Sequence, residues 1–400
     1  MTSSIFSSVK MAPRDPIIGI TEAFNTDTRA SKVNLGAGVY FNDDGKLPLL
    51  NAVRTVERAR LENLPSHGYL PIDGLAAYNK AVQVMLFGKD SPLLAEGKVV
   101  TVQALGGTGA LKVGGDCLKR LLPDATVHIS DPSWENHRAI FENAGFEVHS
   151  YPYYDAVTRG VDFAAMKSRL GALPAGSIVV LHACCHNPTG ADLCEAEWRE
   201  IVDVCQARAL MPFIDMAYQG FADGISEDAV ALKLFAASGL QFFISSSYSK
   251  SFSLYGERVG ALSVVTASTD ESVRVLSQLK QVIRFNYSCP PPLGSALVPA
   301  VRASPELRQM WEAELAGMRE RIKTMRSSLV DRLKMENAAQ DFSFIIRQRG
   351  MFSYTGLSTE QVARLKNEFG VYAVNSGRIC IAALNSGNTD YVAKAIAAVS

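Results

Sequence analysis

Short apolar runs recur along the first 250 residues of the chain, and each gives way to small or polar residues followed by a helical pattern. The runs are rich in Val, Ile, Leu and Phe, which is typical of strands buried on both faces of a parallel sheet. They occupy residues 99–104, 125–129, 177–184, 210–214 and 241–244. This alternation predicts an α/β fold in which helices flank a mostly parallel sheet.

Polar or glycine-rich residues follow every one of these runs. In open α/β sheets, ligands bind just outside the carboxyl ends of the strands. The five clusters therefore predict one shared site. They are GGTG at 106–109, DPSW at 131–134, HNPTG at 186–190, DMAY at 215–218 and SSSYSK at 245–250.

The pattern changes after about residue 306, where a long, charged, amphipathic helix is predicted to run to residue 332. Strand-like pieces follow at residues 342–346 and 350–354. Near the other chain end, residues 32–40 (KVNLGAGVY) alternate as a strand does, and we expect them to pack with the C-terminal part. The predicted division is an N-terminal arm with part of a small domain at 1–47, a large domain at 48–317 and a smaller α/β domain at 318–400.

Composition narrows the class of protein. Of the 400 residues, 48% are hydrophobic, which is enough for a sizeable core. The 40 basic and 40 acidic residues balance, and no run of like charge suits a nucleic acid or a membrane surface. No segment approaches the ~20 apolar residues of a membrane helix. The seven cysteines are odd in number and dispersed, which favours free thiols, so we expect a cytoplasmic enzyme that acts on small molecules.

Lys250 is the first candidate for chemistry, because it follows an apolar strand at the predicted ligand edge, within a run of hydroxyl residues. A lysine becomes a Schiff-base nucleophile when its surroundings favour the neutral amine. Asp215 ends another strand, where a carboxylate is costly unless it has a positive partner such as a protonated pyridine nitrogen. A solvated lysine and a helix-capping aspartate are the plainer alternatives.

Two further clusters suggest ligands. The glycines at 106–109 follow a strand and open a helix, an arrangement that presents backbone N–H groups to a phosphate, although they lack the spacing of dinucleotide or nucleoside-triphosphate motifs. The run from His182 to His186, with Cys184 and Cys185 between them, raises the alternative of a metal such as zinc. We expect no metal there, because adjacent cysteines on a strand point to opposite faces.

Two arginines, Arg284 and Arg378, are followed by apolar or turn-rich sequence, unlike arginines on a solvated face. Guanidinium groups bind carboxylates through paired hydrogen bonds, so two arginines suit a substrate with two carboxylates. Trp134 is either a core residue or a plate on which a flat ring stacks. Tyr69 and Tyr218 are likewise either buried residues or hydroxyl donors.

The ordered motifs closely resemble the class I (fold type I) aminotransferases that depend on pyridoxal phosphate (PLP), in the aspartate and aromatic amino-acid subgroup. The resemblance spans nearly the whole chain, through VNLGAGVY, GYLPIDG, GGTGAL, DPSWENH, HNPTG, FIDMAYQGF, SYSKSFSLYGERVG, IRFNYSCPPP and SGRICIAAL. It implies the PLP-transferase fold type I and a homodimer with shared active sites. It also implies transfer of an amino group to 2-oxoglutarate by a ping-pong mechanism.

The same resemblance implies roles for individual residues. Lys250 would hold PLP as a Schiff base and move the substrate proton. The implied cofactor contacts are Asp215 on the ring nitrogen, Asn187 and Tyr218 on the phenolic oxygen, Trp134 on the ring face, His137 behind Asp215, and Gly107, Thr108, Ser247 and Arg258 on the phosphate, with the partner subunit's Tyr69. The implied substrate contacts are Arg378, Gly38, Trp134, Asn187 and the partner subunit's Arg284.

Three positions bear on the choice of amino acid. Phe41, Leu47 and Cys289 stand where strict aspartate enzymes of the family tend to carry polar residues. Apolar walls favour an aromatic side chain by roughly 25 cal/mol per Å² buried. We therefore expect activity on aspartate or glutamate and on tyrosine and phenylalanine. A strict aspartate aminotransferase and, more remotely, a PLP-dependent decarboxylase or lyase are the alternatives.

Overall fold

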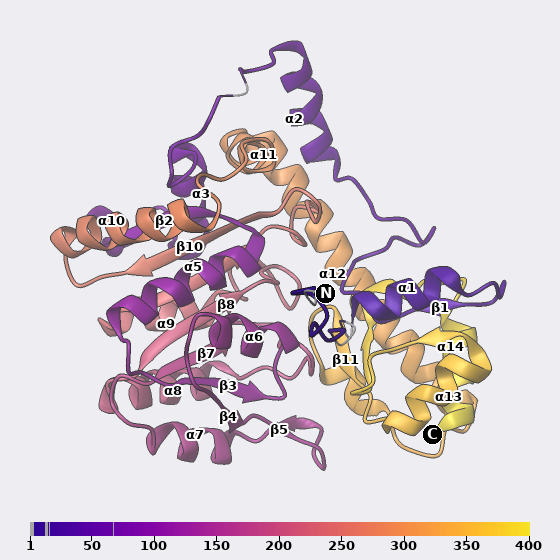
Figure 1. Ribbon diagram of the computed structural model, residues 1–400. Helices are drawn as coiled ribbons and strands as arrows, with labels where there is room; N and C mark the ends of the chain where they lie inside the picture. Colours follow the sequence, from indigo (N-terminus) through magenta and orange to yellow (C-terminus); the bar gives the residue numbers. More distant parts are fainter. Residues whose placement is uncertain (1–3, 13–14, 16, 67) are drawn as a thin grey trace.

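A seven-stranded sheet forms the centre of the larger part of the molecule (Figure 1). The structure is a computed structural model that describes residues 4–12, 15, 17–66 and 68–400. The strand order is β2-β10-β9-β8-β7-β3-β4, and only β10 runs antiparallel to its neighbours within this sheet. The strands are β2 (Val99–Leu105), β3 (Val127–Asp131), β4 (Val148–Pro152), β7 (Ile178–His182), β8 (Met211–Met216), β9 (Phe242–Ser247) and β10 (Val259–Val265). The predicted α/β fold with a mostly parallel sheet is confirmed.

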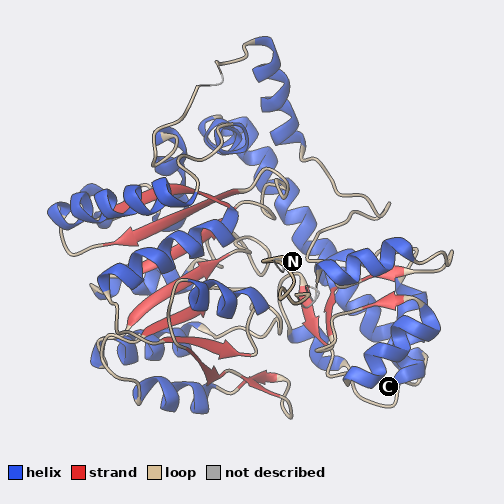
Figure 2. Cartoon of the chain, in the orientation of Figure 1, coloured by secondary structure: helices blue, strands red, loops and turns tan. Residues whose placement is uncertain are grey.

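Helices cover both faces of this sheet (Figure 2). One face packs against α5 (Gly106–Leu121), α6 (Glu135–Asn143) and α10 (Thr269–Asn286). The other face packs against α3 (Ala76–Phe87), α7 (Phe163–Gly171), α8 (Glu195–Ala207), α9 (Val230–Ser238) and α11 (Leu293–Ala303). Burial on both sides explains why strands such as β7 and β10 are apolar at nearly every position.

The two ends of the chain meet in a smaller part, as predicted (Figure 1). Strand β1 (Val33–Asn34) pairs in parallel with β12 (Val371–Tyr372), and β11 (Phe352–Tyr354) pairs antiparallel with β13 (Arg378–Cys380). Helices α1 (Ile18–Thr26), α13 (Thr359–Phe369) and α14 (Thr389–Val399) pack around them. Of the predicted strand at 32–40, only Val33–Asn34 is paired.

The predicted long helix is α12 (Pro305–Met335), whose amino end is capped by Ser304. It joins the two parts of the molecule and runs unbroken across the predicted boundary between residues 317 and 318. The division into 1–47, 48–317 and 318–400 therefore stays a prediction.

The prediction of a strand at residues 342–346 is wrong. These residues form most of a 3₁₀ helix, η1 (Ser343–Arg347). The carboxylate of Asp341 accepts hydrogen bonds from the backbone N–H and the hydroxyl of Ser343, which closes a turn at the start of the apolar run. The apolar residues Phe344 and Ile345 are buried all the same, so the pattern reflected burial and not strand geometry.

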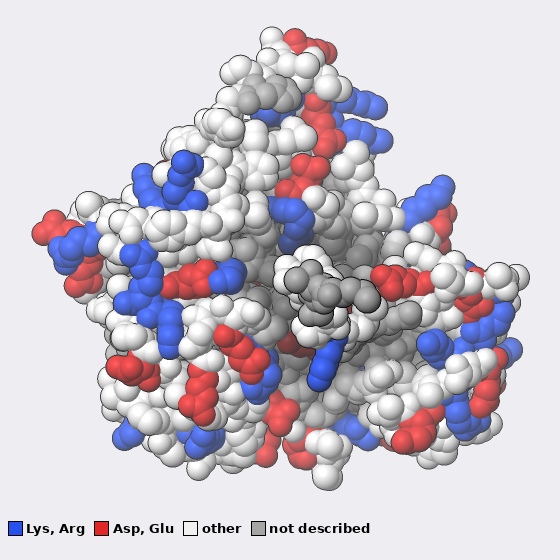
Figure 3. Space-filling model, viewed as in Figure 1, with Lys and Arg blue, Asp and Glu red and all other residues white. Residues whose placement is uncertain are grey.

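The remaining elements lie at the edges of this framework. They are α2 (Asn51–Glu62), α4 (Pro92–Ala95), the hairpin β5 (Tyr154–Asp155) with β6 (Gly160–Val161), and η2 (Ile381–Ala383). Among the helices that the structure describes, none combines the length and the apolar character needed to cross a membrane. Figure 3 shows acidic and basic side chains interspersed over the visible face.

Candidate active site

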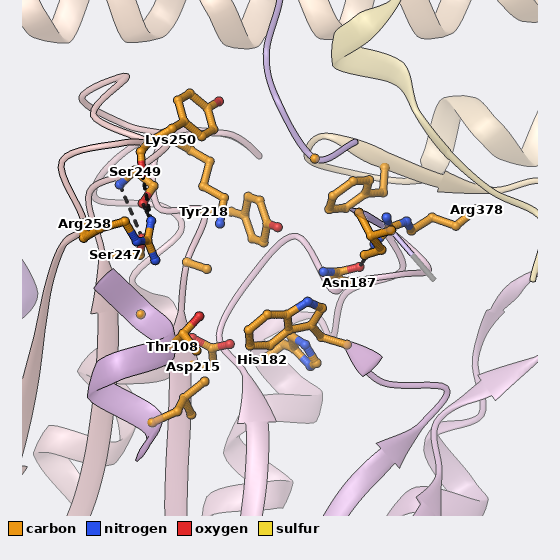
Figure 4. Close-up of a pocket in the computed structure, with 18 residues that line it drawn as sticks. Thr108, His182, Asn187, Asp215, Tyr218, Ser247, Ser249, Lys250, Arg258 and Arg378 are labelled. Atoms are coloured by element: carbon orange, nitrogen blue, oxygen red, sulfur yellow. Dashed lines mark hydrogen bonds between the residues drawn. The ribbon is translucent and has the colours of Figure 1, made fainter. Parts of the chain in front are cut away.

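The carboxyl ends of the central strands meet around one cavity of about 220 Å³ (Figure 4). Segments that follow β2, β3, β7, β8 and β9 form its wall, together with residues from β11 and β13 of the smaller part. The predicted site residues that line it are Gly38, Gly107, Thr108, Trp134, Asn187, Asp215, Tyr218, Ser247, Lys250, Arg258 and Arg378. Residues spread over 340 positions of sequence thus converge on one cavity, as the polar clusters at the strand ends predicted.

Lys250 follows β9 and faces the cavity, with Nζ 4.5 Å from the centre of the Tyr218 ring. Withdrawal of the amine from water lowers the pKa of Lys250 to about 8. The negative charge of Asp215 opposes this lowering, and the positive charge of Arg258 adds to it. An amine with this pKa is partly neutral under physiological conditions, and the neutral amine is the form that attacks a carbonyl carbon.

Asp215, the last residue but one of β8, is a buried carboxylate with two hydrogen-bond partners. Its Oδ2 lies 3.0 Å from Nε2 of His137, and its Oδ1 accepts a hydrogen bond of 3.1 Å from the hydroxyl of Ser245. Burial raises the pKa of Asp215, but the hydrogen bond and charge of His137, together with the charges of His182 and Lys250, outweigh it, so that the net pKa is lowered. Asp215 is therefore an anion prepared for a positive partner in the cavity.

His182 also lines the cavity, and the sequence had suggested it only as a metal ligand. Its ring lies 4.9 Å from that of His137. Burial, with the charge of His137, lowers the pKa of His182 to about 3, so this ring is neutral. The other histidine of the suggested metal cluster, His186, has one ring nitrogen 2.9 Å from the Ser130 hydroxyl and the other 2.8 Å from that of Thr189. With both nitrogens engaged, His186 has none free for a metal.

An anion-binding cradle lies at the start of α5. The helix begins at Gly106, and its first backbone N–H groups have no partner within the helix. The Thr108 and Ser247 side chains line the cavity beside it. Gly106 has φ +69°, and a Cβ there would meet Nη2 of Arg258 at 2.4 Å. Glycine is therefore required for the guanidinium to approach the helix start, where helix and cation together suit a phosphate.

Arg378 is buried on β13, on the side of the cavity formed by the smaller part (Figure 4). Its Nη1 donates to Oδ1 of Asn187 at 3.0 Å, and its Nη2 donates to the carbonyl of Gly36 at 2.8 Å. The guanidinium carbon lies 4.4 Å from the centre of the Phe352 ring. Its Nε is buried and has no hydrogen-bond partner among the described residues, so the hydrogen-bonding capacity of this guanidinium is not fully used within the chain.

Two other walls of the cavity are aromatic. Trp134 lies edge-on to the His137 ring, with the ring centres 5.2 Å apart. Gly38 lies against Phe352, because a Cβ at Gly38 would meet the tip of that ring at 2.9 Å. The missing side chain at Gly38 keeps this wall open.

Some predicted residues lie elsewhere on the chain. The Tyr69 side chain is 97% exposed, and Arg284 is exposed on α10, where it contacts Ser288. Neither residue lines the cavity of this chain. The same holds for the positions tied to specificity, Phe41, Leu47 and Cys289. His137 also stands outside the cavity wall, behind Asp215, as expected.

Sequence reasoning missed several residues of the wall. Ser249 and Tyr255 belong to the segment that carries Lys250 and Arg258, so their place in the chain was a usable signal. Phe352 gave none, because it looks like any core residue of a strand. The other lining residues not foreseen are Ile17, Leu111, His182 and Ala217.

The groups around the cavity fit pyridoxal phosphate. The helix start with Arg258 suits its phosphate, Asp215 suits its ring nitrogen, and the amine of Lys250 suits its aldehyde. Arg378 lies across the cavity from this set, where its guanidinium would bind a substrate carboxylate. The site thus offers each chemical group of the cofactor a partner.

Comparison with known proteins points to the same chemistry. Residues 30–396 match the family model described as aminotransferase class I and II. An aspartate aminotransferase of Pseudomonas aeruginosa is 63% identical over 396 residues, covering 99% of this chain and all of that protein. An aromatic-amino-acid aminotransferase of Escherichia coli is 51% identical over 398 residues, with the same coverage.

Solved structures are equally similar. An aromatic-amino-acid aminotransferase from Burkholderia pseudomallei, covalently bound to pyridoxal phosphate, has a TM-score of 0.96 and 64% identity, with 99% of each chain covered. A cytoplasmic aspartate aminotransferase from Saccharomyces cerevisiae has a TM-score of 0.97 and 38% identity, covering 99% of this chain and 98% of its own. The chain therefore belongs to the class I and II aminotransferases, in the subgroup of the aspartate and aromatic-amino-acid enzymes, and is an aminotransferase.

Proposed function

We propose that this protein moves amino groups from aspartate or glutamate, and also from tyrosine and phenylalanine, to 2-oxoglutarate with PLP as its cofactor. The observation that carries the proposal is the convergence of Lys250, Asp215 and Arg378 on one cavity. An amine, a paired carboxylate and a buried guanidinium are the groups needed to hold an aldehyde, a pyridine nitrogen and a substrate carboxylate. The proposed mechanism is ping-pong: the first oxo acid leaves before the second oxo acid binds.

The use of PLP is confirmed by the family and by the PLP-bound neighbour at 64% identity. The bound cofactor supplies a ring that takes up the electron pair left when the substrate Cα loses its proton. In our assignment Asp215 faces its ring nitrogen, Trp134 its ring face, and Asn187 with Tyr218 its phenolic oxygen. The residues assigned to its phosphate are Gly107, Thr108, Ser247 and Arg258.

Lys250 is the proton carrier in this proposal. Its Nζ accepts the proton that leaves the substrate Cα and later donates it, and a pKa of about 8 permits both steps near neutral pH. Asp215 stays ionised throughout, because its pKa is lowered despite its burial by His137 and by the charges of His182 and Lys250. The negative charge of Asp215 would keep the ring nitrogen of the cofactor protonated.

Arg378 binds the substrate α-carboxylate in this proposal, since its side chain is buried, oriented by Asn187 and not fully hydrogen-bonded among the described residues. The partner subunit's Arg284 binds the distal carboxylate of a dicarboxylic substrate, and the partner subunit's Tyr69 contacts the phosphate of the cofactor. The exposure of both side chains, away from the cavity of their own chain, supports a homodimer with shared sites. The seven cysteines, all with free thiols, support the cytoplasmic location that we propose.

The range of donors is tested by comparing kcat/KM for aspartate, tyrosine and phenylalanine, each with 2-oxoglutarate. Similar relatives named for aspartate and for aromatic amino acids support activity on both. We expect values within about two orders of magnitude of one another, because a hydrophobic wall discriminates weakly. A preference for aspartate by several orders of magnitude would identify a strict aspartate aminotransferase.

The reaction class is tested with Lys250→Ala. This variant is expected to lose turnover together with the visible absorption of the bound cofactor. Turnover at the wild-type rate would refute the role of Lys250. Release of carbon dioxide or ammonia from the wild-type protein, in place of an oxo acid, would identify a decarboxylase or lyase.

A further inference from the structure

A cluster of sulfur atoms lies beside the strand ends and outside the proposed active site. The thiol of Cys184 is 3.7 Å from the thioether sulfur of Met216. The thiol sulfur of Cys185 and a carboxylate oxygen of Asp228 lie within 4.8 Å of the Cys184 sulfur and of each other. All four side chains are buried.

The two thiols lie on one side because the chain leaves strand geometry before them. Strand β7 ends at His182, and Cys185 has φ +52°, in the left-handed region. The expectation that Cys184 and Cys185 point to opposite faces is therefore wrong, since it assumed that the strand continued. Gly350 packs directly against Cys185, where a Cβ at Gly350 would lie 2.4 Å from that of Cys185.

The cluster lies next to the active site but on the other face of β8, and the Cys185 thiol is 3.9 Å from the carbonyl oxygen of Tyr218, whose side chain lines the active-site cavity. Asp215 and Met216 are adjacent on β8, so their side chains project to opposite faces. Asp215 contacts His137 of α6 and lines the proposed active site. Met216 packs with Cys184 and Cys185 in the core on the other face. A ligand bound at the sulfur atoms would therefore not occupy the PLP cavity.

A second cavity, of about 370 Å³, gives access to the cluster. Cys184 and Asp228 line it together with the exposed residues Cys194 and Arg349. A small ion can therefore reach the Cys184 thiol from solvent. The four backbone N–H groups of residues 220, 222, 223 and 224 donate to the carboxylate of Asp228, so its oxygens are already engaged. The sulfur atoms are the available ligands.

A positive charge faces the cluster from α12. The guanidinium of Arg326 is buried and donates to backbone carbonyls and to the Ser353 hydroxyl. Burial, with the negative charges of Asp192 and Asp228, raises the pKa of Cys185 to about 11, while a hydrogen bond with Cys184 and the charge of Arg326 act in the opposite direction.

We propose that Cys184, Cys185 and Met216 form a binding site for a soft monovalent metal ion, Cu(I) or Ag(I). Thiolates and a thioether are the ligands that such ions prefer, whereas zinc sites use four thiolate, imidazole or carboxylate ligands and calcium uses oxygen. On binding, each thiol gives its proton to solvent and forms one metal–sulfur bond, and Met216 donates a lone pair. The metal keeps its oxidation state.

The test is a titration of the PLP-loaded protein with Cu(I), without oxygen, against a chromogenic Cu(I) chelator. One tightly held Cu(I) per chain is expected. Cys184→Ser, Cys185→Ser and Met216→Leu are each expected to weaken binding by roughly tenfold or more. Cys194→Ser is the matched control at the mouth of the same cavity and is expected to bind as the wild type does. Unchanged binding in all three cluster variants, or loss in Cys194→Ser, overturns the proposal.

X-ray absorption at the copper edge keeps the test decisive if a cysteine variant fails to fold. The wild-type protein is expected to show three sulfur neighbours, and Met216→Leu, which preserves side-chain volume, is expected to show two. A shell of nitrogen or oxygen neighbours would contradict the site. Because the titration measures metal and not turnover, its result is independent of the proposed transaminase activity.

Discussion

Burial and two charged residues, Asp215 and Arg258, set the charge state of Lys250, and each of the two charges can be removed separately. We expect a pKa of about 8 for Lys250 in the cofactor-free protein. Asp215→Asn is expected to lower this pKa further, since a negative charge that favours the ammonium form is lost. Arg258→Met is expected to raise it, since a positive charge that disfavours that form is lost. The pH dependence of Lys250 modification by an amine reagent, located by mass spectrometry, measures all three values.

The two variants are controls for each other, because both change one charge near the same amine. Shifts in opposite directions support the electrostatic account. Shifts in the same direction, or a pKa near the ordinary lysine value of 10.5 in the wild-type protein, would show that another factor governs the amine.

His137 is expected to act through Asp215 on cofactor affinity. His137→Phe removes the 3.0 Å hydrogen bond to the carboxylate and leaves a buried charge less satisfied. A hydrogen bond to a charged group contributes about 1.5–3 kcal/mol, so the Kd of PLP is expected to rise by about ten- to a hundredfold. Equilibrium dialysis of PLP measures it. His137→Gln retains a donor and is expected to recover part of the affinity, and equal Kd values for His137→Phe and wild type would contradict this role.

Residues of the site were predictable from sequence where their chemistry stood out against the local pattern. Lys250 and Asp215 are charged groups at the ends of apolar strands, and burial of such groups demands a partner. Phe352 could not be found in this way, because an aromatic residue in an apolar strand is expected in any core. The sulfur cluster could not be found either, since it depends on the positive φ of Cys185, which the sequence does not reveal.

At the scale of elements, the turn that contains Gly190, after β7, packs closely against the segment that leads into β11. Gly190 has φ +68°, and a Cβ there would lie 2.8 Å from the carbonyl oxygen of Phe352 and 3.0 Å from that of Arg349. Gly190→Ala therefore combines backbone strain with a steric clash and is expected to lower the free energy of unfolding by about 2–5 kcal/mol. Urea unfolding measures the loss.

Gly239, which ends α9, is the matched control. It has φ +79°, but a Cβ there would meet nothing within 4 Å. Gly239→Ala is expected to cost only the backbone strain, about 1–2 kcal/mol. Equal losses for the two variants would show that the contact with the β11 segment does not contribute.

The elements best predicted from sequence are the long ones whose burial is uniform. Strands of the parallel sheet are apolar on both faces, and α12 keeps its amphipathic pattern over 31 residues. Strands of two or three residues, such as β1 and β12, are too short to display a period. The 3₁₀ helix η1 was misread because burial alone makes its residues apolar.

At the scale of the whole molecule, the proposed sharing of residues between subunits predicts complementation. Lys250→Ala and Arg284→Leu chains are each expected to be nearly inactive on aspartate. Refolding them together produces hybrid dimers, in which one of the two sites has both native residues. Random pairing makes half of the dimers hybrids, so about a quarter of the wild-type activity is expected to return. Activity no higher than the mean of the separate variants would place Arg284 outside the partner's site.

Helix α12 ties the surroundings of Lys250 to the smaller part of the molecule. Near its amino end, the indole of Trp311 donates to the carbonyl of Ser251 at 2.7 Å and stacks on Phe252 with ring centres 4.5 Å apart. Farther along the helix, Arg326 donates hydrogen bonds to the backbone carbonyls of Gly350 and Phe352, at the start of β11. Trp311 is therefore an intrinsic fluorophore fixed next to the segment that carries Lys250. Its emission is expected to change with each half-reaction, so that turnover can be followed by intrinsic tryptophan fluorescence without a label.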